Sequence, residues 1–343
     1  MAAIDHRRTL RALLTAALLL TATSLAACSS DDPSAAPEST TKPQASGSTG
    51  AAPESLVQPV GTYEVRHSGL TLVDETRTTK AHGGVTEKPE RTLRLDVWYP
   101  EVPEGAQVPL VVFSHGSTRR AVHYEATLKA WASAGYVVVG PDFPLSKEGT
   151  PGGTDYGGLA EQAGDVSFVI DEVLAMADDP EQRWAELVDP DRVGLGGQSF
   201  GAITSVAVAI NPCCTDPRVG AITEFAGAWT EFGSDAPVPT GDAPPALIIH
   251  GAADPTVAYA RGTELFDMYP GFRQLLTLVD SDHNAGFFMG LEDPLDELVT
   301  RASVAFYDEF LKDDPTAAQR LDALVGDAGS DVATLQTEGE RPG

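Results

Sequence analysis

Cysteine and basic residues are scarce in this sequence. Its 343 residues include only 3 cysteines, which excludes a disulfide-rich scaffold. Lys and Arg together number 23 against 50 Asp and Glu, and the formal net charge is −27. Because binding to nucleic acid requires cations that neutralise phosphates, we exclude nucleic acid as a partner. The acidic excess is more simply explained by a well-solvated surface.

Metal-ligand clusters, dinucleotide-binding glycines and long apolar runs are also missing. No group of His and Cys has the spacing of metal ligands, and no G-x-G-x-x-G follows the first buried run. We therefore expect neither a metal nor another cofactor. Hydrophobic residues make up 42% of the chain and charged residues 21%, which is ordinary for a globular protein and excludes a polytopic membrane protein.

The N-terminus has the layout of an export signal. Three arginines accompany the apolar stretch 12–20, which is too short to cross a bilayer as a mature helix. The segment ends in Leu25-Ala26-Ala27-Cys28, which resembles the lipobox of bacterial lipoproteins. That resemblance implies cleavage before Cys28 and attachment of acyl chains such as palmitate to its sulfur, which would anchor the protein to the outer face of the cell membrane. The alternative is an ordinary secretory signal, cleaved near the same place.

Composition divides the rest of the chain into three parts. Residues 28–55 follow the signal 1–27, and beyond Cys28 they contain no Val, Ile, Leu, Met, Phe, Trp or Tyr, so we expect a flexible tether. Residues 56–313 have the size of one domain. Residues 314–343 are polar and acidic with a weak helical pattern, and we expect them to form a tail outside that domain.

Residues 56–313 show the pattern of an α/β fold. Alternating apolar and polar residues at 62–73 and 92–99 predict two antiparallel strands. Continuous apolar runs then alternate with helical stretches, which is typical of a mostly parallel sheet covered by helices on both faces. The runs predicted as strands are 110–113, 136–139, 193–196, 219–225, 246–249 and 274–279, and the predicted helices are 123–134, 166–174, 202–210, 258–268 and 295–311. In such a sheet the site lies at the carboxyl ends of the strands.

The motif Gly197-Gln198-Ser199-Phe200-Gly201 lies between a predicted strand and a predicted helix. G-x-S-x-G in this context is the pattern of a nucleophile elbow, a tight turn that presents a serine and leaves no room for side chains two positions away. The turn also places Ser199 at a helix N-terminus, where negative charge is favourable. Ser199 is therefore our candidate nucleophile. The alternative is a glycine-rich turn with an incidental serine.

With this motif the chain resembles the α/β-hydrolase superfamily. The likeness extends to Ser114-His115-Gly116-Ser117, which follows the apolar run 110–113 and is similar to the oxyanion loop of that family. By that likeness, the backbone N–H groups of Ser117 and Phe200 would stabilise the tetrahedral intermediate, each by about 3 kcal/mol. His115 would then hold the shape of the loop and take no part in the chemistry.

The order nucleophile, acid, base along the chain selects the general base. Only His250 and His283 follow Ser199. His250 ends a buried run and precedes every good acid candidate, so we expect it to pack or to hydrogen-bond near the acid loop. His283 lies in a polar loop after the last predicted strand and is our candidate base, with a surface histidine as the alternative.

The candidate acid is Asp254, which follows the apolar run 246–249 and resembles the acid turn of the family. Its role would be to hold the imidazole tautomer and to stabilise the imidazolium. Glu224 is the rival, because some family members take their acid from the preceding strand. Asp280 and Asp282 lie within three residues of the base, and we expect them to cap its loop.

Three groups within the superfamily are similar to this chain. Phe143-Pro144-Leu145 and the stretch 165–171 look like segments of dienelactone-hydrolase-like and platelet-activating-factor-acetylhydrolase-like enzymes, and the cutinase-like polyester hydrolases are also similar. Dienelactone hydrolase itself has a cysteine where this chain has Ser199, which counts against lactone specificity. Trp229 follows the run 219–225, as a tryptophan does in the acetylhydrolase and polyester groups, where it lines the acyl pocket. The alternative is a tryptophan packed in a loop.

The predicted site is uncapped. The stretch between the runs 219–225 and 246–249 is short and rich in Pro and Gly, so we expect no large helical cap. An uncapped site offers limited apolar area, which favours short acyl chains or polyester-like substrates. Elsewhere, Cys213 and Cys214 either form a vicinal disulfide, which an exported protein permits, or remain free thiols.

Together these residues predict a secreted, lipid-anchored and monomeric serine esterase. Ser199, Asp254 and His283 would form its catalytic triad. One alternative is a surface-displayed binding lipoprotein that uses the fold without turnover, against which the complete set of catalytic residues argues. A peptidase or thioesterase with the same triad is the other alternative.

Overall fold

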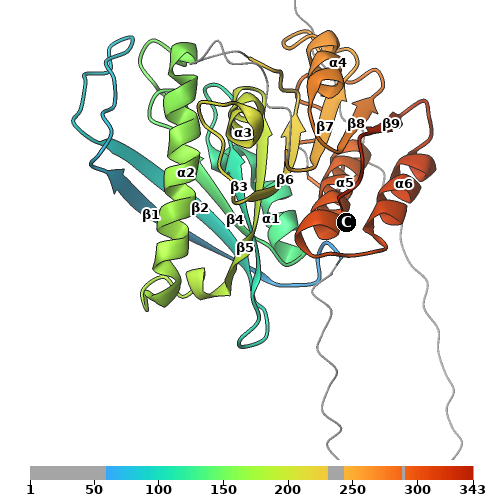
Figure 1. The fold of residues 1–343 in the computed structure, drawn as a ribbon, viewed down its shortest axis with the longest axis horizontal. Coiled ribbons are helices and arrows are strands. Elements are labelled where there is room, and N and C mark those ends of the chain that lie inside the picture. The colour runs from blue at the N-terminus through green and yellow to red at the C-terminus, as the bar shows by residue number, and fades with distance from the viewer. Residues whose placement is uncertain (1–58, 231–242, 288–289, 343) are drawn as a thin grey trace, which may run out of the picture. The chain divides into compact units, whose positions relative to one another are not determined.

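The strands of this protein form a sheet in which their spatial order differs from their order in the chain. The computed structural model describes residues 59–230, 243–287 and 290–342. Within those residues, nine strands pair in the order β1-β2-β4-β3-β5-β6-β7-β8-β9 (Figure 1). Their bounds are Val65–Asp74, Arg91–Pro100, Val108–Ser114, Val137–Asp142, Val188–Gln198, Val219–Phe225, Ala246–Gly251, Arg273–Leu278 and Ala333–Glu338 for β1 to β9.

The central strands run parallel, and the edges are antiparallel. Parallel pairing joins β4, β3, β5, β6, β7 and β8 in that order, whereas β1 pairs with β2, β2 with β4, and β9 with β8 in antiparallel fashion. Every residue of β3, β4 and β7 is buried, which explains why these strands read as continuous apolar runs. The predicted α/β fold with a mostly parallel sheet and an antiparallel start is therefore confirmed.

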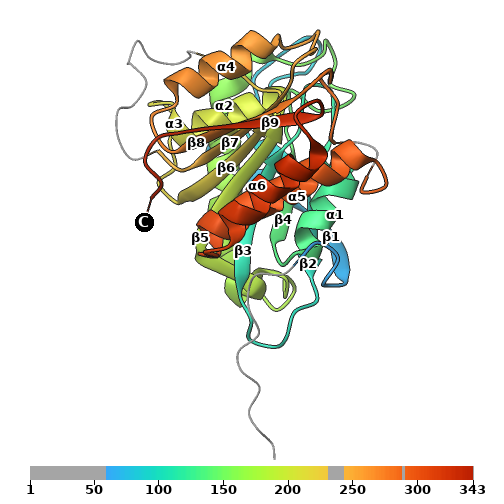
Figure 2. The ribbon, with the colours of Figure 1, turned by 90° about the vertical axis from the view of Figure 1, so that its right-hand side faces the viewer.

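Helices cover both faces of the sheet. Among the described residues, α1 to α6 span Glu125–Ser133, Leu159–Ala175, Phe200–Ile210, Tyr259–Met268, Pro294–Leu311 and Ala317–Ala328. Apolar side chains of α2, α3 and α4 pack in one buried cluster, and those of α1, α5 and α6 pack in another. Figure 2 shows these two groups of helices on opposite sides of the strands. The sheet is thus covered as the sequence predicts.

Two helix starts show how local sequence sets the fold. At α5, the Asp293 carboxylate accepts two backbone N–H groups of the first turn, and Pro294 follows at a position that needs no donor. At α3, the residue before the helix is Ser199, whose side chain makes no capping hydrogen bond. The amides of the first turn of α3 are therefore not satisfied by a side-chain cap.

The segment 314–343, predicted as a tail outside the domain, is instead part of it. Helix α6 presents Ala317, Leu321 and Val325 at a spacing of four residues, and all three are buried. Strand β9 then extends the sheet along β8, from the pair Leu278–Ala333 to the pair Arg273–Glu338. The domain therefore extends beyond the predicted boundary at residue 313. The sequence pattern missed this because α6 packs through only three apolar residues and β9 is held mainly by backbone pairing with β8.

Some of the predicted features lie outside the described residues. These are the signal 1–27, the tether 28–55 with its lipidation site Cys28, and residues 231–242 of the stretch that is expected to carry no cap. In the part of the chain that is described, no helix combines the length and the apolar character needed to cross a membrane.

Candidate active site

Ser199 occupies a strained turn between β5 and α3. Its backbone has φ +55° and ψ −120°, a region that residues other than glycine rarely adopt. The Ser199 N–H donates to the Phe225 carbonyl oxygen at the end of β6, 2.8 Å away. This bond ties the turn to the neighbouring strand and holds the hydroxyl at the carboxyl end of the sheet.

The glycines two positions before and after Ser199 are required by close backbone contacts. A Cβ at Gly197 would overlap the carbonyl group of Gly201, and a Cβ at Gly201 would overlap the carbonyl group of Ser114 in the next strand. Neither obstacle is the end of a flexible side chain that could move aside. The elbow is therefore held by backbone packing that only glycine permits.

Asp254 and His283 meet beside this turn. They follow the parallel neighbours β7 and β8, so the two loops emerge at the same edge of the sheet. The His283 Nδ1–H donates to Asp254 Oδ2 over 2.7 Å, and Asp254 Oδ1 accepts the backbone N–H groups of Thr256 and Val257 at 2.7 and 2.9 Å. Because a carboxylate only accepts, this bond leaves Nε2 of the neutral imidazole as the acceptor.

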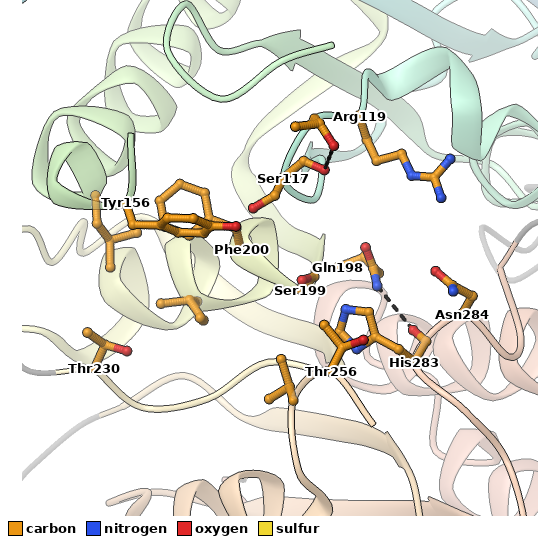
Figure 3. Close-up of a pocket in the computed structure, with 14 residues that line it drawn as sticks. Ser117, Arg119, Tyr156, Gln198, Ser199, Phe200, Thr230, Thr256, His283 and Asn284 are labelled. Carbon is orange, nitrogen blue, oxygen red and sulfur yellow. Dashed lines mark hydrogen bonds between the residues drawn. The ribbon is translucent and has the colours of Figure 1, made fainter. Parts of the chain in front are cut away.

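Ser199 and His283 line one pocket with a volume of about 590 Å³. Figure 3 shows Ser199 near the centre of this pocket, with the His283 ring close to it. The lining residues are Ser117, Thr118, Arg119, Tyr156, Leu159, Gln198, Ser199, Phe200, Ile203, Thr230, Thr256, Val257, His283 and Asn284. The nucleophile and the base predicted from the sequence thus share one cavity, with the predicted acid hydrogen-bonded to the base.

The two predicted oxyanion donors also belong to this pocket. Ser117 follows β3, and Phe200 is the first residue of α3. Within the described residues, neither backbone N–H donates a hydrogen bond to another group of the protein. Both amides are therefore available to a developing negative charge next to Ser199.

His115 is buried behind the oxyanion loop and outside the pocket. Its Nε2 accepts the Phe143 N–H at 3.1 Å, so Nδ1 carries the proton and donates to the Gly116 carbonyl oxygen at 2.8 Å. Burial lowers the pKa of His115 to about 4, and the ring is neutral at physiological pH. It braces the loop, as the sequence suggested.

His250 is a second imidazole beside the acid, close to the same carboxylate oxygen that His283 contacts. Its Nε2–H donates to the Val257 carbonyl oxygen at 2.8 Å and lies 3.4 Å from Asp254 Oδ2. Burial lowers the pKa of His250, which keeps the ring neutral beside the carboxylate. Its place near the acid loop matches the expectation for this residue.

Glu224 is buried beneath the elbow, on β6. Its Oε2 accepts the Gly227 N–H at 2.9 Å, while Oε1 has no hydrogen-bond partner among the described residues. Burial raises the pKa of Glu224 to about 8, so this side chain is largely protonated at neutral pH. No hydrogen bond or ion pair joins it to His283 in the described part of the chain. The arrangement favours Asp254 over Glu224 as the partner of the base.

A set of hydrogen bonds that the sequence did not reveal joins the turn of Ser199 to the loop of His283 and to the oxyanion loop at Gly116. The Gln198 amide donates to the His283 carbonyl oxygen at 3.2 Å, and its Oε1 accepts the Tyr124 hydroxyl at 2.9 Å. That hydroxyl in turn accepts the Gly116 N–H at 3.1 Å. Gln198 occupies a variable position of the G-x-S-x-G motif, which gives no signal for this role.

Two other predicted features lie away from the chemistry. Trp229 is buried in the core and is not among the residues that line the pocket, although its neighbour Thr230 is. Cys213 and Cys214 form a vicinal disulfide just beyond the C-terminal end of α3, the end opposite to Ser199.

The Asp282 carboxylate accepts the Asn284 N–H at 2.8 Å, as expected for a cap of the histidine loop.

Among the described residues, no group of three or more His, Cys, Asp or Glu side chains is placed to hold a metal ion.

No family model matches the chain, and no curated protein does. A solved structure that is similar to it is the ferulic acid esterase from Streptomyces cinnamoneus, with a TM-score of 0.58 and 19% sequence identity. The match covers 77% of this chain and 95% of that one. This protein therefore shares the α/β fold of an esterase.

Proposed function

We propose that this protein is a serine hydrolase that cleaves carboxylic esters. The observation that carries the proposal is the placement of Ser199 on a strained turn, in one pocket with an imidazole that is bonded to Asp254 at 2.7 Å. A nucleophile, a base in a defined tautomer and a carboxylate behind it are the parts required for acyl transfer. The likeness in fold to a ferulic acid esterase supports the same class of reaction.

Each residue has a defined part in the proposed reaction. Ser199 Oγ attacks the ester carbonyl carbon while His283 Nε2 takes its proton, and Asp254 stabilises the imidazolium that forms. The amides of Ser117 and Phe200 donate to the oxyanion. Collapse breaks the bond between the carbonyl carbon and the leaving oxygen, and the imidazolium gives its proton to that oxygen. Water, deprotonated by the same imidazole, then attacks the acyl-enzyme; the bond between the acyl carbon and Ser199 Oγ breaks, the imidazolium returns its proton to Oγ, and the acid is released.

The pocket sets the size of the substrate. Its volume of about 590 Å³ suits a small ester, and its apolar wall is formed by Leu159, Phe200, Ile203 and Val257. The Tyr156 ring packs edge-on against Phe200 with centroids 5.2 Å apart. A short aliphatic acyl group or one aromatic ring would fit this wall. Polyester-like substrates would present the same groups one unit at a time.

The test of the proposal is a series of p-nitrophenyl esters from acetate to palmitate, together with a feruloyl ester. Wild-type protein should turn over the short members, and Ser199→Ala should lower kcat by roughly 10⁵–10⁶. The matched control is Ser68→Ala on the edge strand β1, which removes the same hydroxyl far from the pocket and should retain activity. Activity of Ser199→Ala within tenfold of wild type would refute the elbow assignment. Turnover of peptides or thioesters in place of esters would favour those substrate classes.

We also propose that the protein is exported as a monomer and anchored through Cys28. The support is the lipobox-like Leu25-Ala26-Ala27-Cys28 after a basic and apolar segment. In cells given an alkyne-labelled palmitate, the wild-type protein should acquire label and Cys28→Ala should not. Cys213→Ala is the matched control and should remain labelled. Labelling that survives Cys28→Ala would contradict the anchor site.

A further inference from the structure

The residue before Ser199 has a buried side chain that is bonded on two sides. Gln198 ends β5 and is 3% exposed. Its amide nitrogen donates to the His283 carbonyl oxygen at 3.2 Å, a bond that Figure 3 draws as a dashed line, and its Oε1 accepts the Tyr124 hydroxyl at 2.9 Å. Through one amide group, Gln198 thus contacts the loop of the base and the tyrosine that supports the oxyanion loop.

These hydrogen bonds run in one direction, from the oxyanion loop to the base. The Gly116 N–H can only donate, and it donates to the Tyr124 hydroxyl oxygen at 3.1 Å. The Tyr124 hydroxyl proton goes to Gln198 Oε1, so the NH₂ group of the amide faces the His283 carbonyl oxygen. Each group in this series meets a partner of the opposite type, and each bond polarises the next. The orientation of the Gln198 amide is therefore fixed by its neighbours.

At the oxyanion loop, the series of bonds fixes the backbone next to a proposed donor. The Gly116 carbonyl group and the Ser117 N–H belong to one planar peptide unit, so a rotation of that carbonyl also turns the donor. The Gly116 carbonyl oxygen accepts the His115 Nδ1–H at 2.8 Å and the Arg119 backbone N–H at 3.1 Å. Tyr124 holds the N–H on the other side of Gly116. The direction of the Ser117 N–H therefore depends on contacts at both ends of Gly116.

Gly116 also packs directly against Gln198. A Cβ at Gly116 would come within 2.5 Å of Gln198 Oε1, 3.2 Å of the Gln198 carbonyl oxygen and 3.1 Å of the Tyr124 hydroxyl. The φ of Gly116 is not positive, so this position needs glycine for its close contacts and not for its backbone conformation. The oxyanion loop thus lies in contact with the same amide that bonds the loop of the base.

At the base, Gln198 supplies a second point of attachment. The His283 ring is bonded to Asp254, with Nδ1 and Oδ2 2.7 Å apart. The His283 carbonyl oxygen is bonded to Gln198, which is the neighbour of Ser199 in the chain. Because of this bond, the loop of the base cannot shift away from Ser199 without losing a buried hydrogen bond. The two attachments together restrict the separation of the proposed nucleophile and its base.

We propose that Gln198 and Tyr124 are positioning residues that hold the oxyanion donor Ser117 and the base His283 in place relative to Ser199. This role rests on the proposed ester hydrolysis and adds two residues to it. Neither residue exchanges a proton with the substrate, and Tyr124 is not among the described residues that line the pocket. Displacement of a reacting group by about 1 Å can cost about 10²-fold in rate. Loss of either side chain should therefore lower kcat, whereas KM should change little.

The first variant, Tyr124→Phe, removes one hydroxyl and keeps the ring. With p-nitrophenyl acetate and the full-length protein, we expect kcat to fall about ten- to hundredfold and KM to stay within twofold of wild type. The matched control is Tyr269→Phe, which removes a buried hydroxyl that donates to the Pro244 carbonyl oxygen at 2.7 Å. The control should keep kcat within twofold. Since both variants lose a buried hydrogen bond, the comparison separates positioning from stability.

The second variant, Gln198→Met, keeps a side chain of similar length but removes both hydrogen bonds of the amide. We expect kcat to fall at least as far as in Tyr124→Phe, again with little change in KM. The matched control is Gln274→Met at the start of β8, which removes a buried amide that donates to Thr337 Oγ1 at 3.2 Å. That control should keep kcat within twofold of wild type.

Two further readouts distinguish a positioning role from a structural one. Phenylboronic acid mimics the tetrahedral intermediate, because Ser199 Oγ adds to the boron atom while His283 takes the proton, which leaves an anion at the oxyanion donors. Its Ki should rise in Tyr124→Phe about as much as kcat falls, whereas a loss of folded protein would not change Ki. In the double variant of Tyr124→Phe and Gln198→Met, kcat should fall by much less than the product of the two single effects, since the residues act through one series of bonds.

The outcomes separate the positioning role from the proposed function. If kcat and Ki in Tyr124→Phe and Gln198→Met match those of their controls while wild-type protein hydrolyses the ester, the positioning role is overturned and the esterase remains. Single effects that multiply fully in the double variant would overturn the connection between the two residues. Thermal unfolding checks that each variant is folded, and either variant decides the question if the other does not fold. Absence of turnover by wild-type protein would instead contradict the proposed function.

Discussion

The turn that carries Ser199 and the loops that carry Asp254 and His283 are stabilised in different ways. The turn is held by shape, because a Cβ at Gly197 or Gly201 would overlap backbone groups. The loops are held by polar contacts, since Asp254 accepts hydrogen bonds from His283 and from two backbone amides. A substitution that adds even one carbon atom should therefore disrupt the turn of Ser199. The loops of Asp254 and His283 should instead be sensitive to substitutions that keep the volume but change a hydrogen-bonding group.

The acid loop can be disrupted without a steric change by Asp254→Asn. The amide keeps the volume, but its NH₂ group cannot accept the His283 Nδ1–H, so the imidazole loses the tautomer that the reaction needs. We expect kcat to fall by about 10³–10⁴ while the Tm remains close to that of wild type. Asp282→Asn is the matched control and should retain activity within a few fold. A decrease of less than tenfold in Asp254→Asn would remove this residue from the triad.

The elbow can be disrupted by a single methyl group in Gly201→Ala. The added Cβ would overlap the Ser114 carbonyl group, so we expect the free energy of unfolding to fall by about 3 kcal/mol or more, as measured by urea denaturation. The control is Gly326→Ala in α6, where no atom lies within 4 Å of the added Cβ. That variant should gain about 0.5–1 kcal/mol. Equal stability of the two variants would show that the elbow is not sterically limited.

Glu224 is a buried carboxyl group on β6. Among the described residues it makes no hydrogen bond to Asp254 or His283. Its carboxyl holds its proton in the folded state up to a pH of about 8, whereas the unfolded chain releases it near 4.5. Stability should therefore decrease as the pH rises between these two values, because the folded state binds the extra proton. Glu224→Gln should flatten this dependence in urea denaturation at pH 5 and pH 8, with kcat within threefold of wild type. An equally steep dependence in the variant would contradict the assignment.

The smallest effect is expected at the end of α3 that lies away from Ser199. The disulfide joins adjacent residues, Cys213 and Cys214, and so removes little entropy from the unfolded chain. Reduction should shift the Tm by no more than about 2 °C and leave the proposed esterase activity unchanged. A large loss of activity on reduction would show that this end of α3 affects the elbow.

The difference between the Ser199 turn and the two loops also explains how much of the site the sequence could predict. The elbow is local, so five consecutive residues indicate both Ser199 and the glycines around it. The base and acid follow from the order along the chain and from loops after buried runs, which indicate Asp254 and His283. The connection through Gln198 and Tyr124 joins residues 74 positions apart, and no local pattern predicts such a contact. Trp229 is predicted to line the pocket because a tryptophan of similar enzymes occupies the same position after a strand, and that position does not determine how its ring packs.

The part of the fold that the sequence did not predict is the packing of residues 314–343, which depends on a few apolar side chains of α6 and on strand β9. The central strands are continuous apolar runs, so their positions along the chain follow from the sequence pattern. Helix α6 and strand β9 instead rely on a narrow stripe around Leu321 and Val325 and on pairing with β8. The stripe gives a weak signal, because alanine, glycine and charged residues make up most of the rest of the helix.

Strand β9 has a practical consequence for truncated versions of the protein. A chain ending at residue 313 would leave the backbone N–H and C=O groups of β8 without partners along one edge, and such an edge recruits strands from other molecules. It would also weaken β8, whose carboxyl end leads into the loop of His283. Any shortened form intended for crystallisation or assay should therefore extend at least to Glu338.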